Sequence, residues 1–130
     1  MTEETLLLDT CAILWLASGS RDLSKAARSA ISDAQMVCVS PVSAWEIAIK
    51  VSKGKIVLPC TAREWFNAVV RLYDIDVLKM TSDDMLKAAE LPWLHKDPAD
   101  RFIIATALAN NFTVVTSDGN FPRYGVRTIC

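Results

Sequence analysis

The sequence has 130 residues, of which 52% are hydrophobic, and a formal net charge of −1. This length and composition exclude a disordered chain and predict a single domain, residues 1–130, with one well-filled core. The longest apolar run near the N-terminus, residues 11–17, is too short to cross a bilayer, and the acidic first residues lack the positive charge of a signal peptide. The four scattered cysteines form no C-x-x-C pair. We therefore expect a cytoplasmic protein with reduced thiols and no membrane association.

Short apolar segments alternate with helical patterns along the chain. We expect strands at residues 5–9, 36–40, 75–80, 112–118 and 126–129. We expect helices at residues 22–34, 40–51, 61–73, 81–92 and 97–108. Most of the strands are continuously apolar, which is typical of strands covered on both faces. The order of the elements predicts a three-layer α/β/α fold around a twisted, mainly parallel sheet of about five strands.

Two of the expected strands end in an aspartate. Asp9 closes the first strand, and Asp118 closes the strand at residues 112–118. Aspartate favours turns, which accounts for either residue alone. If the two strands are neighbours in the sheet, both carboxylates face the crevice beyond its carboxyl edge, where α/β proteins bind ligands.

Two helical segments carry further acids. Glu46 lies on the narrow polar strip of an otherwise apolar helix, and that strip either forms a surface ion pair with Lys50 or faces a polar cleft. Asp97, followed by Pro98, is an expected helix N-cap. Asp100 then continues the buried ridge of a nearly all-apolar helix, and a desolvated carboxylate there needs a partner such as a cation.

Four carboxylates that share a crevice repel one another unless a cation joins them. Mg²⁺ or Mn²⁺ takes oxygen ligands and commonly coordinates a substrate phosphate as well. The chemistry expected of such a site is metal-assisted hydrolysis of a phosphodiester. It needs no histidine nucleophile, and the chain has a single histidine, His95.

The chain resembles PIN-domain ribonucleases, most closely VapC-type toxins. Four stretches carry the resemblance by their order and approximate spacing: LLLDTCAIL, SAWEIAIK, DPADRFIIATAL and VVTSD. The resemblance implies a PIN-like fold and an RNA-cleaving site that binds Mg²⁺ or Mn²⁺. The catalytic and metal-binding residues that it implies are Asp9, Glu46, Asp100 and Asp118. Thr10 and Thr116 match positions that support these acids, and Asp97 is a second candidate for capping or a peripheral role.

The resemblance also implies partners. Toxins of this type are held inactive by a cognate antitoxin and commonly form homodimers, and we take Trp15 and Trp93 as candidates for these contacts. Without the four site acids, 11 acidic and 14 basic residues leave a net charge of +3. A surface of this charge is compatible with a negatively charged RNA backbone. The candidate RNA contacts, all close in sequence to the acids, are Lys50, Lys53, Lys96 and Arg101.

Two alternatives stay open beside a toxin ribonuclease. One is a PIN nuclease of RNA maturation or DNA repair that has no antitoxin. The other is a phosphorylation-controlled signalling receiver, which has this length and an acidic metal pocket. A receiver needs an acid at the end of a middle strand and a lysine after a late one, and neither follows residues 36–40 or 112–118.

Overall fold

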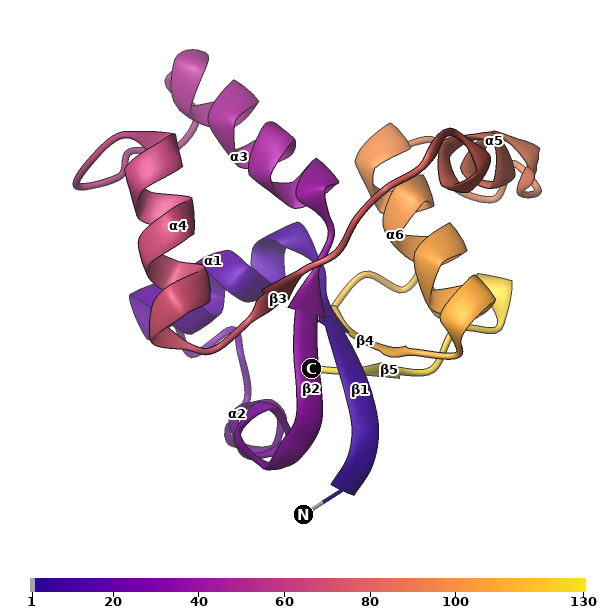
Figure 1. The fold of residues 1–130 in the computed structure, drawn as a ribbon, viewed down its shortest axis with the longest axis horizontal. Coiled ribbons are helices and arrows are strands. Elements are labelled where there is room, and N and C mark those ends of the chain that lie inside the picture. The colour runs from indigo at the N-terminus through magenta and orange to yellow at the C-terminus, as the bar shows by residue number, and fades with distance from the viewer. Residues whose placement is uncertain (1) are drawn as a thin grey trace.

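The computed structural model describes residues 2–130, and the strands in this range form a single parallel sheet. The five strands within it are β1 (Thr2–Leu8), β2 (Ala34–Val39), β3 (Asp76–Val77), β4 (Thr113–Val115) and β5 (Thr128–Ile129). Their order across the sheet is β3-β2-β1-β4-β5, and every neighbouring pair runs parallel (Figure 1). The expected five-stranded parallel sheet is confirmed.

Helices connect the strands in the alternation that a parallel sheet requires. The helices of the described range are α1 (Thr10–Ser18), α2 (Lys25–Asp33), α3 (Pro41–Ser52), α4 (Ala62–Leu72), α5 (Ser82–Glu90), α6 (Pro98–Asn110) and the 3₁₀ turn η1 (Pro122–Tyr124). The helices from α2 to α6 follow the expected ones to within a few residues. No helix in the described range is long and apolar enough to cross a membrane.

Helix α1 is not predicted by the sequence pattern. Its residues are apolar almost all round, so they show no amphipathic period, and they read instead as an apolar run after a strand. Its ends are nevertheless well marked: the Asp9 side chain accepts from the N–H of Ala12, and Gly19 closes the helix with φ +70°. A positive φ at this position is the conformation that favours glycine.

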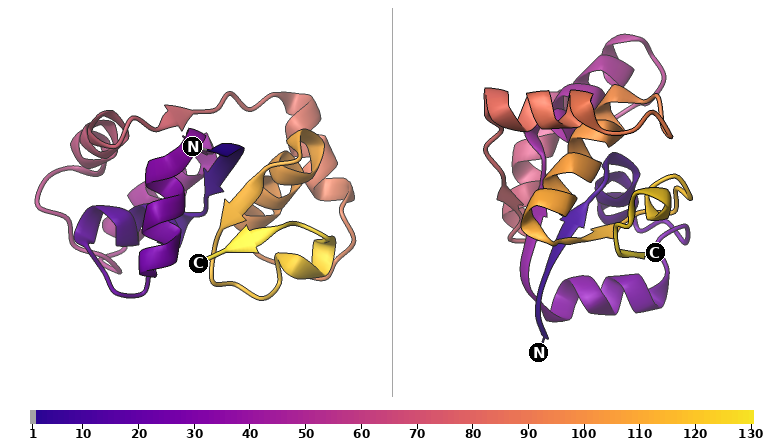
Figure 2. Two further views of the ribbon diagram at one scale, coloured as in Figure 1. Left: turned by 90° about the horizontal axis from the view of Figure 1, so that it is seen from below. Right: turned by 90° about the vertical axis from the view of Figure 1, so that its right-hand side faces the viewer.

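The sheet is covered on both faces. Along β1, Leu6 and Leu8 join a core with residues of α1, α2 and α4, whereas Leu7 joins a second core with α6. Successive residues of a strand point to opposite faces, so a wholly apolar strand fills both cores. Figures 1 and 2 show α1, α2 and α4 on one side of the sheet and α6, backed by α5, on the other. The expected three-layer α/β/α arrangement is confirmed.

The carboxyl edge of the sheet is where β1 and β4 end side by side. Leu8 is in register with Val115, and the N–H of Asp9 donates to the carbonyl of Val115 at 3.1 Å. Helix α3 reaches across this edge, because its Val42 lies in one core and its Ile47 in the other. The sheet therefore brings the acids after β1 and β4 together, with α3 above them.

Candidate active site

Asp9 is the most buried acid at this edge, with 5% of its surface exposed. Its Oδ1 accepts from the N–H of Ala12 at 2.7 Å, so the residue both ends β1 and caps α1. Burial raises the pKa of Asp9, the Thr116 hydroxyl and the Ala12 N–H oppose that rise, and the negative charges of Asp118 and Glu46 add to it. The electrostatic coupling indicates that these three acids share one site.

Asp100 belongs to the same cluster and lies in the first turn of α6. The pKa of Asp100 is raised to about 6: burial is the largest cause, His95 opposes the rise, and the charges of Asp97 and Asp9 add to it. The His95 imidazole is its direct neighbour, with 2.8 Å between Nε2 and Oδ2 of Asp100. A carboxyl group held in this way at a cleft is typical of functional sites.

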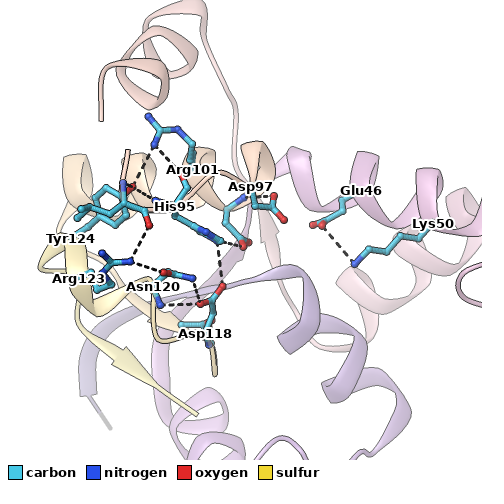
Figure 3. Close-up of polar contacts among 12 residues, drawn as sticks. Glu46, Lys50, His95, Asp97, Arg101, Asp118, Asn120, Arg123 and Tyr124 are labelled. Atoms are coloured by element: carbon cyan, nitrogen blue, oxygen red, sulfur yellow. Dashed lines mark hydrogen bonds and ion pairs between the residues drawn. The ribbon is translucent and has the colours of Figure 1, made fainter. Parts of the chain in front are cut away.

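His95 lies within the candidate site, although the sequence analysis did not place it there. Its Nε2 lies 3.3 Å from Oδ2 of Asp118 as well as 2.8 Å from Asp100, so one imidazole nitrogen joins two of the predicted acids (Figure 3). The histidine lies in the connector before α6, where no periodic pattern says which way a side chain points. Its position in the sequence, two residues before the Asp97 cap, was the available signal that it lies near the site.

Asp118 is held by the loop that follows β4. Its N–H donates to the hydroxyl of Thr116 at 3.0 Å, and its Oδ1 accepts from both the backbone and the side-chain amide of Asn120. Oδ2 is left to face His95. The prediction that Thr116 supports an acid fits this geometry, and Asn120 is a second support that sequence reasoning missed.

Glu46 satisfies both alternatives that its sequence position left open. Its Oε2 pairs with Lys50 at 3.6 Å, and its side chain also extends toward the cluster from the side opposite His95 (Figure 3). Oε1 is buried and has no hydrogen-bond partner among the described residues. A buried carboxylate oxygen without a partner is costly, which points to a ligand that the polypeptide itself does not supply.

Two supporting residues differ in what they do. Asp97 accepts from the N–H of Asp100 at 3.2 Å, so its predicted capping role is confirmed. The Thr10 hydroxyl is buried and donates to that of Ser43 at 3.0 Å, which ties α1 to α3. Its partner thus lies on the helix that carries Glu46, and the support of the acids by Thr10 stays a prediction.

The candidate RNA contacts divide in the same way. Lys53 and Lys96 are exposed, and Lys50 is partly exposed beside Glu46. Arg101 does not fit an RNA contact, since only 3% of its surface is exposed. Its guanidinium faces away from the crevice and donates to a set of backbone carbonyls, those of Ala88, Ala89, Leu91, Pro92 and His95.

The donor set fits a small divalent cation. Ligand atoms of His95, Asp100 and Asp118 lie within 4.8 Å of one another, and the buried charge of Asp9 adds to the same pocket. The unpartnered Oε1 of Glu46 is a further oxygen donor. Carboxylate oxygens suit Mg²⁺ and Mn²⁺, and a cation held this way can polarise a phosphate and activate water.

Comparison with known proteins matches nearly the whole chain. The PIN domain model matches residues 6–127. Ribonuclease VapC22 of Mycobacterium tuberculosis (strain ATCC 25618 / H37Rv) is 30% identical over 115 residues, which cover 88% of this chain and 87% of that protein. Among solved structures, VapBC2 from Rickettsia felis, bound to a DNA fragment from its promoter, superposes with a TM-score of 0.69 at 16% identity, covering 96% of this chain and 97% of that one.

A toxin-antitoxin complex from Klebsiella pneumoniae gives a TM-score of 0.67 at 16% identity and covers 96% of each chain. DNA-bound VapBC from Salmonella typhimurium gives 0.64 at 18% identity and covers 97% of each chain. At these identities the structural likeness concerns the fold. The described sheet, with its order β3-β2-β1-β4-β5, is accordingly the fold of these structures.

Proposed function

This chain belongs to the PIN-domain family, and on that premise we propose that it is a metal-dependent endoribonuclease that acts as the toxin of a toxin–antitoxin pair. The observation that carries the proposal is the convergence of Asp9, Glu46, Asp100 and Asp118 at one edge of the sheet, each from a different element. Family membership excludes the signalling receiver. The name of the Mycobacterium tuberculosis relative, a ribonuclease, supports RNA as the substrate.

The residues of the site divide the work of hydrolysis. Asp9, Asp100 and Asp118 would hold Mg²⁺ or Mn²⁺, which supplies Lewis acidity at the scissile phosphate when bound. The free Oε1 of Glu46 accepts a hydrogen bond from the attacking water and orients it. Lys50 pairs with Oε2 of Glu46 at 3.6 Å, which leaves Oε1 for this role. The positive ends of α1 and α6 face the same edge and favour a bound phosphate.

We propose a cognate antitoxin and a second copy of the chain as the protein partners of this cytoplasmic enzyme. The solved relatives include toxin-antitoxin complexes, which supports the first partner. The surface supports both. Trp45 is 58% exposed and lines a groove of about 700 Å³ between α3 and the α5–α6 pair. Trp93 is 70% exposed and lines a separate hollow of about 280 Å³ between α5 and α6. Trp15 is half-buried against the core, so Trp93 is the better contact candidate of the two expected.

The decisive experiment is cleavage of a mixed RNA pool by the purified chain with Mg²⁺, with Mn²⁺ and with EDTA. We expect metal-dependent cleavage that falls on the order of 100-fold or more in Asp9→Asn, since asparagine keeps the cap on α1 but removes the charge. Asp33→Asn, at the exposed end of α2, is the matched control and should cleave normally. Cleavage that survives EDTA and Asp9→Asn would overturn the proposed site.

A growth assay separates the toxin from a PIN nuclease of RNA maturation or DNA repair. Expression of the chain should arrest bacterial growth, and Asp9→Asn should abolish the arrest. Co-expression of a small protein encoded next to the chain should restore growth if that protein is the antitoxin. Active cleavage without any growth arrest would support the alternative nuclease.

A further inference from the structure

The imidazole of His95 is the nitrogen donor that the structure adds to an otherwise oxygen-only site. We propose that His95 is itself a ligand of the divalent cation, so that the site binds first-row transition ions such as Mn²⁺ in preference to Mg²⁺. The proposal rests on the proposed metal-dependent function and deepens it. Its basis is the position of Nε2 between Asp100 and Asp118, with all three ligand atoms within 4.8 Å of one another.

The separations match those of neighbouring donors around one small ion. Octahedral bonds of about 2.1 Å place adjacent donors roughly 3.0 Å apart. Nε2 of His95 lies 2.8 Å from Oδ2 of Asp100 and 3.3 Å from Oδ2 of Asp118. Nε2 can thus occupy a position adjacent to each of the two carboxylate oxygens in one coordination shell.

The imidazole is placed by its own scaffold rather than left on a mobile surface. The N–H of His95 donates to the Tyr124 hydroxyl at 2.9 Å, and its carbonyl accepts from the Arg101 guanidinium at 3.1 Å. The same hydroxyl donates to the carbonyl of Pro92 at 2.6 Å. The imidazole is 16% exposed. These backbone contacts fix the position of the residue that carries the imidazole.

Arg101 ties this scaffold to the site through the sequence itself. It directly follows Asp100, and its guanidinium donates to carbonyls at the end of α5 and in the connector that carries His95. The face of Trp93 stacks over the guanidinium at 3.7 Å. One buried side chain therefore holds the histidine at a fixed position relative to the aspartate beside it.

An imidazole nitrogen changes which ion the site prefers. Mg²⁺ prefers oxygen ligands. Imidazole binds first-row transition ions, including Mn²⁺, more strongly than it binds Mg²⁺. The competing interpretation is that His95 is a resident positive charge that pairs with Asp100 and Asp118. The two interpretations predict opposite signs: removal of a ligand weakens the binding of the metal ion, and removal of a competing charge strengthens it.

The chain holds one histidine, which makes the test specific to a residue. Pulsed EPR of the Mn²⁺-loaded chain, expressed without a histidine tag, should show coupling to ¹⁴N. Growth on ¹⁵N-histidine should convert that signal to the ¹⁵N pattern. In His95→Gln the signal should disappear, and the Kd for Mn²⁺ should rise about 10- to 100-fold, with a smaller change in the Kd for Mg²⁺.

Each result decides the inference. Mn²⁺ binding without nitrogen coupling, or tighter Mn²⁺ binding by His95→Gln, overturns the histidine ligand and leaves the nuclease proposal in place. Failure of the wild-type chain to bind either ion overturns both. If His95→Gln does not fold by circular dichroism, the isotope experiment on the wild-type chain still settles whether the histidine binds the metal.

Discussion

Replacing Asp100 should make the metal-free protein more stable. Asp100 is ionised at neutral pH inside the first turn of α6, and its side chain is 18% exposed. Replacing it with asparagine keeps a similar shape and one oxygen that accepts from His95, and it removes the buried charge. We therefore expect Asp100→Asn to abolish cleavage while raising the free energy of unfolding in EDTA.

The magnitude follows from the pKa of Asp100, which is raised from its ordinary 3.8 to about 6, chiefly by burial and against the opposing effect of His95. A change of one in pKa is worth about 1.4 kcal/mol, so ionised Asp100 costs roughly 3 kcal/mol above pH 6. The cost is absent below pH 4, where both states are protonated, and it grows between the two values. This pKa already includes the contact with His95, so the net gain from Asp100→Asn should be about 3 kcal/mol, or roughly 12 °C in Tm.

Urea unfolding of the two proteins in EDTA at about pH 4.5 and pH 7.5 measures this difference. The stabilisation of Asp100→Asn should be large at the higher pH and small at the lower one, and Asp33→Asn serves as an exposed control. Mn²⁺ should stabilise the wild-type chain but not the variant. If Asp100→Asn were no more stable than wild type at pH 7.5, the burial of an ionised carboxylate would not be costly, and the reasoning would fail.

Three further predictions follow from neighbouring residues. Asp97→Asn should cleave RNA within about threefold of the wild-type rate, because asparagine also caps a helix. Asp97→Ala should lose ~1 kcal/mol in urea unfolding, because alanine does not. If Asp97→Asn were as inactive as Asp100→Asn, the assignment of Asp100 rather than Asp97 as the site acid would be reversed. Arg101→Lys should lose at least ~2 kcal/mol, since an ammonium cannot reach all the carbonyls that the guanidinium contacts, and unchanged unfolding would refute this. Lys50→Gln should lower RNA affinity uniformly across sequences and reduce the salt slope by about one in fluorescence anisotropy.

The centre of the sheet was predictable from sequence, and its edges were not. The second halves of β1 and β2 and the whole of β4 are buried on both faces, so their continuous apolar runs reveal them. Strands β3 and β5 have two residues each, where the sequence suggests six and four. Their length depends on how far a neighbouring strand extends beside them, which is a tertiary property. Helix α1 escaped because a helix buried on most sides has no polar face.

The acids of the site were predictable because secondary structure alone places them. Asp9 and Asp118 follow strands, and Asp100 lies one turn into a capped helix, so periodicity and topology suffice. The roles of His95 and Arg101 depend on the conformation of the connector before α6. Contacts with Tyr124, far along the chain, fix that connector. No local pattern encodes such contacts.

The way the two strand-end aspartates are tethered has a consequence for ion denticity. Oδ1 of Asp9 accepts from the N–H of Ala12, and Oδ1 of Asp118 accepts from Asn120, so the other oxygen of each carboxylate is the freer one, which favours monodentate binding. Ca²⁺ binds six to eight oxygens at longer distances and is often coordinated by bidentate carboxylates, whereas Mg²⁺ and Mn²⁺ are coordinated by monodentate carboxylates and retained water molecules. We expect Ca²⁺ to compete poorly with Mn²⁺ in a displacement titration, so that the chain discriminates against calcium through two backbone hydrogen bonds rather than through the size of its pocket.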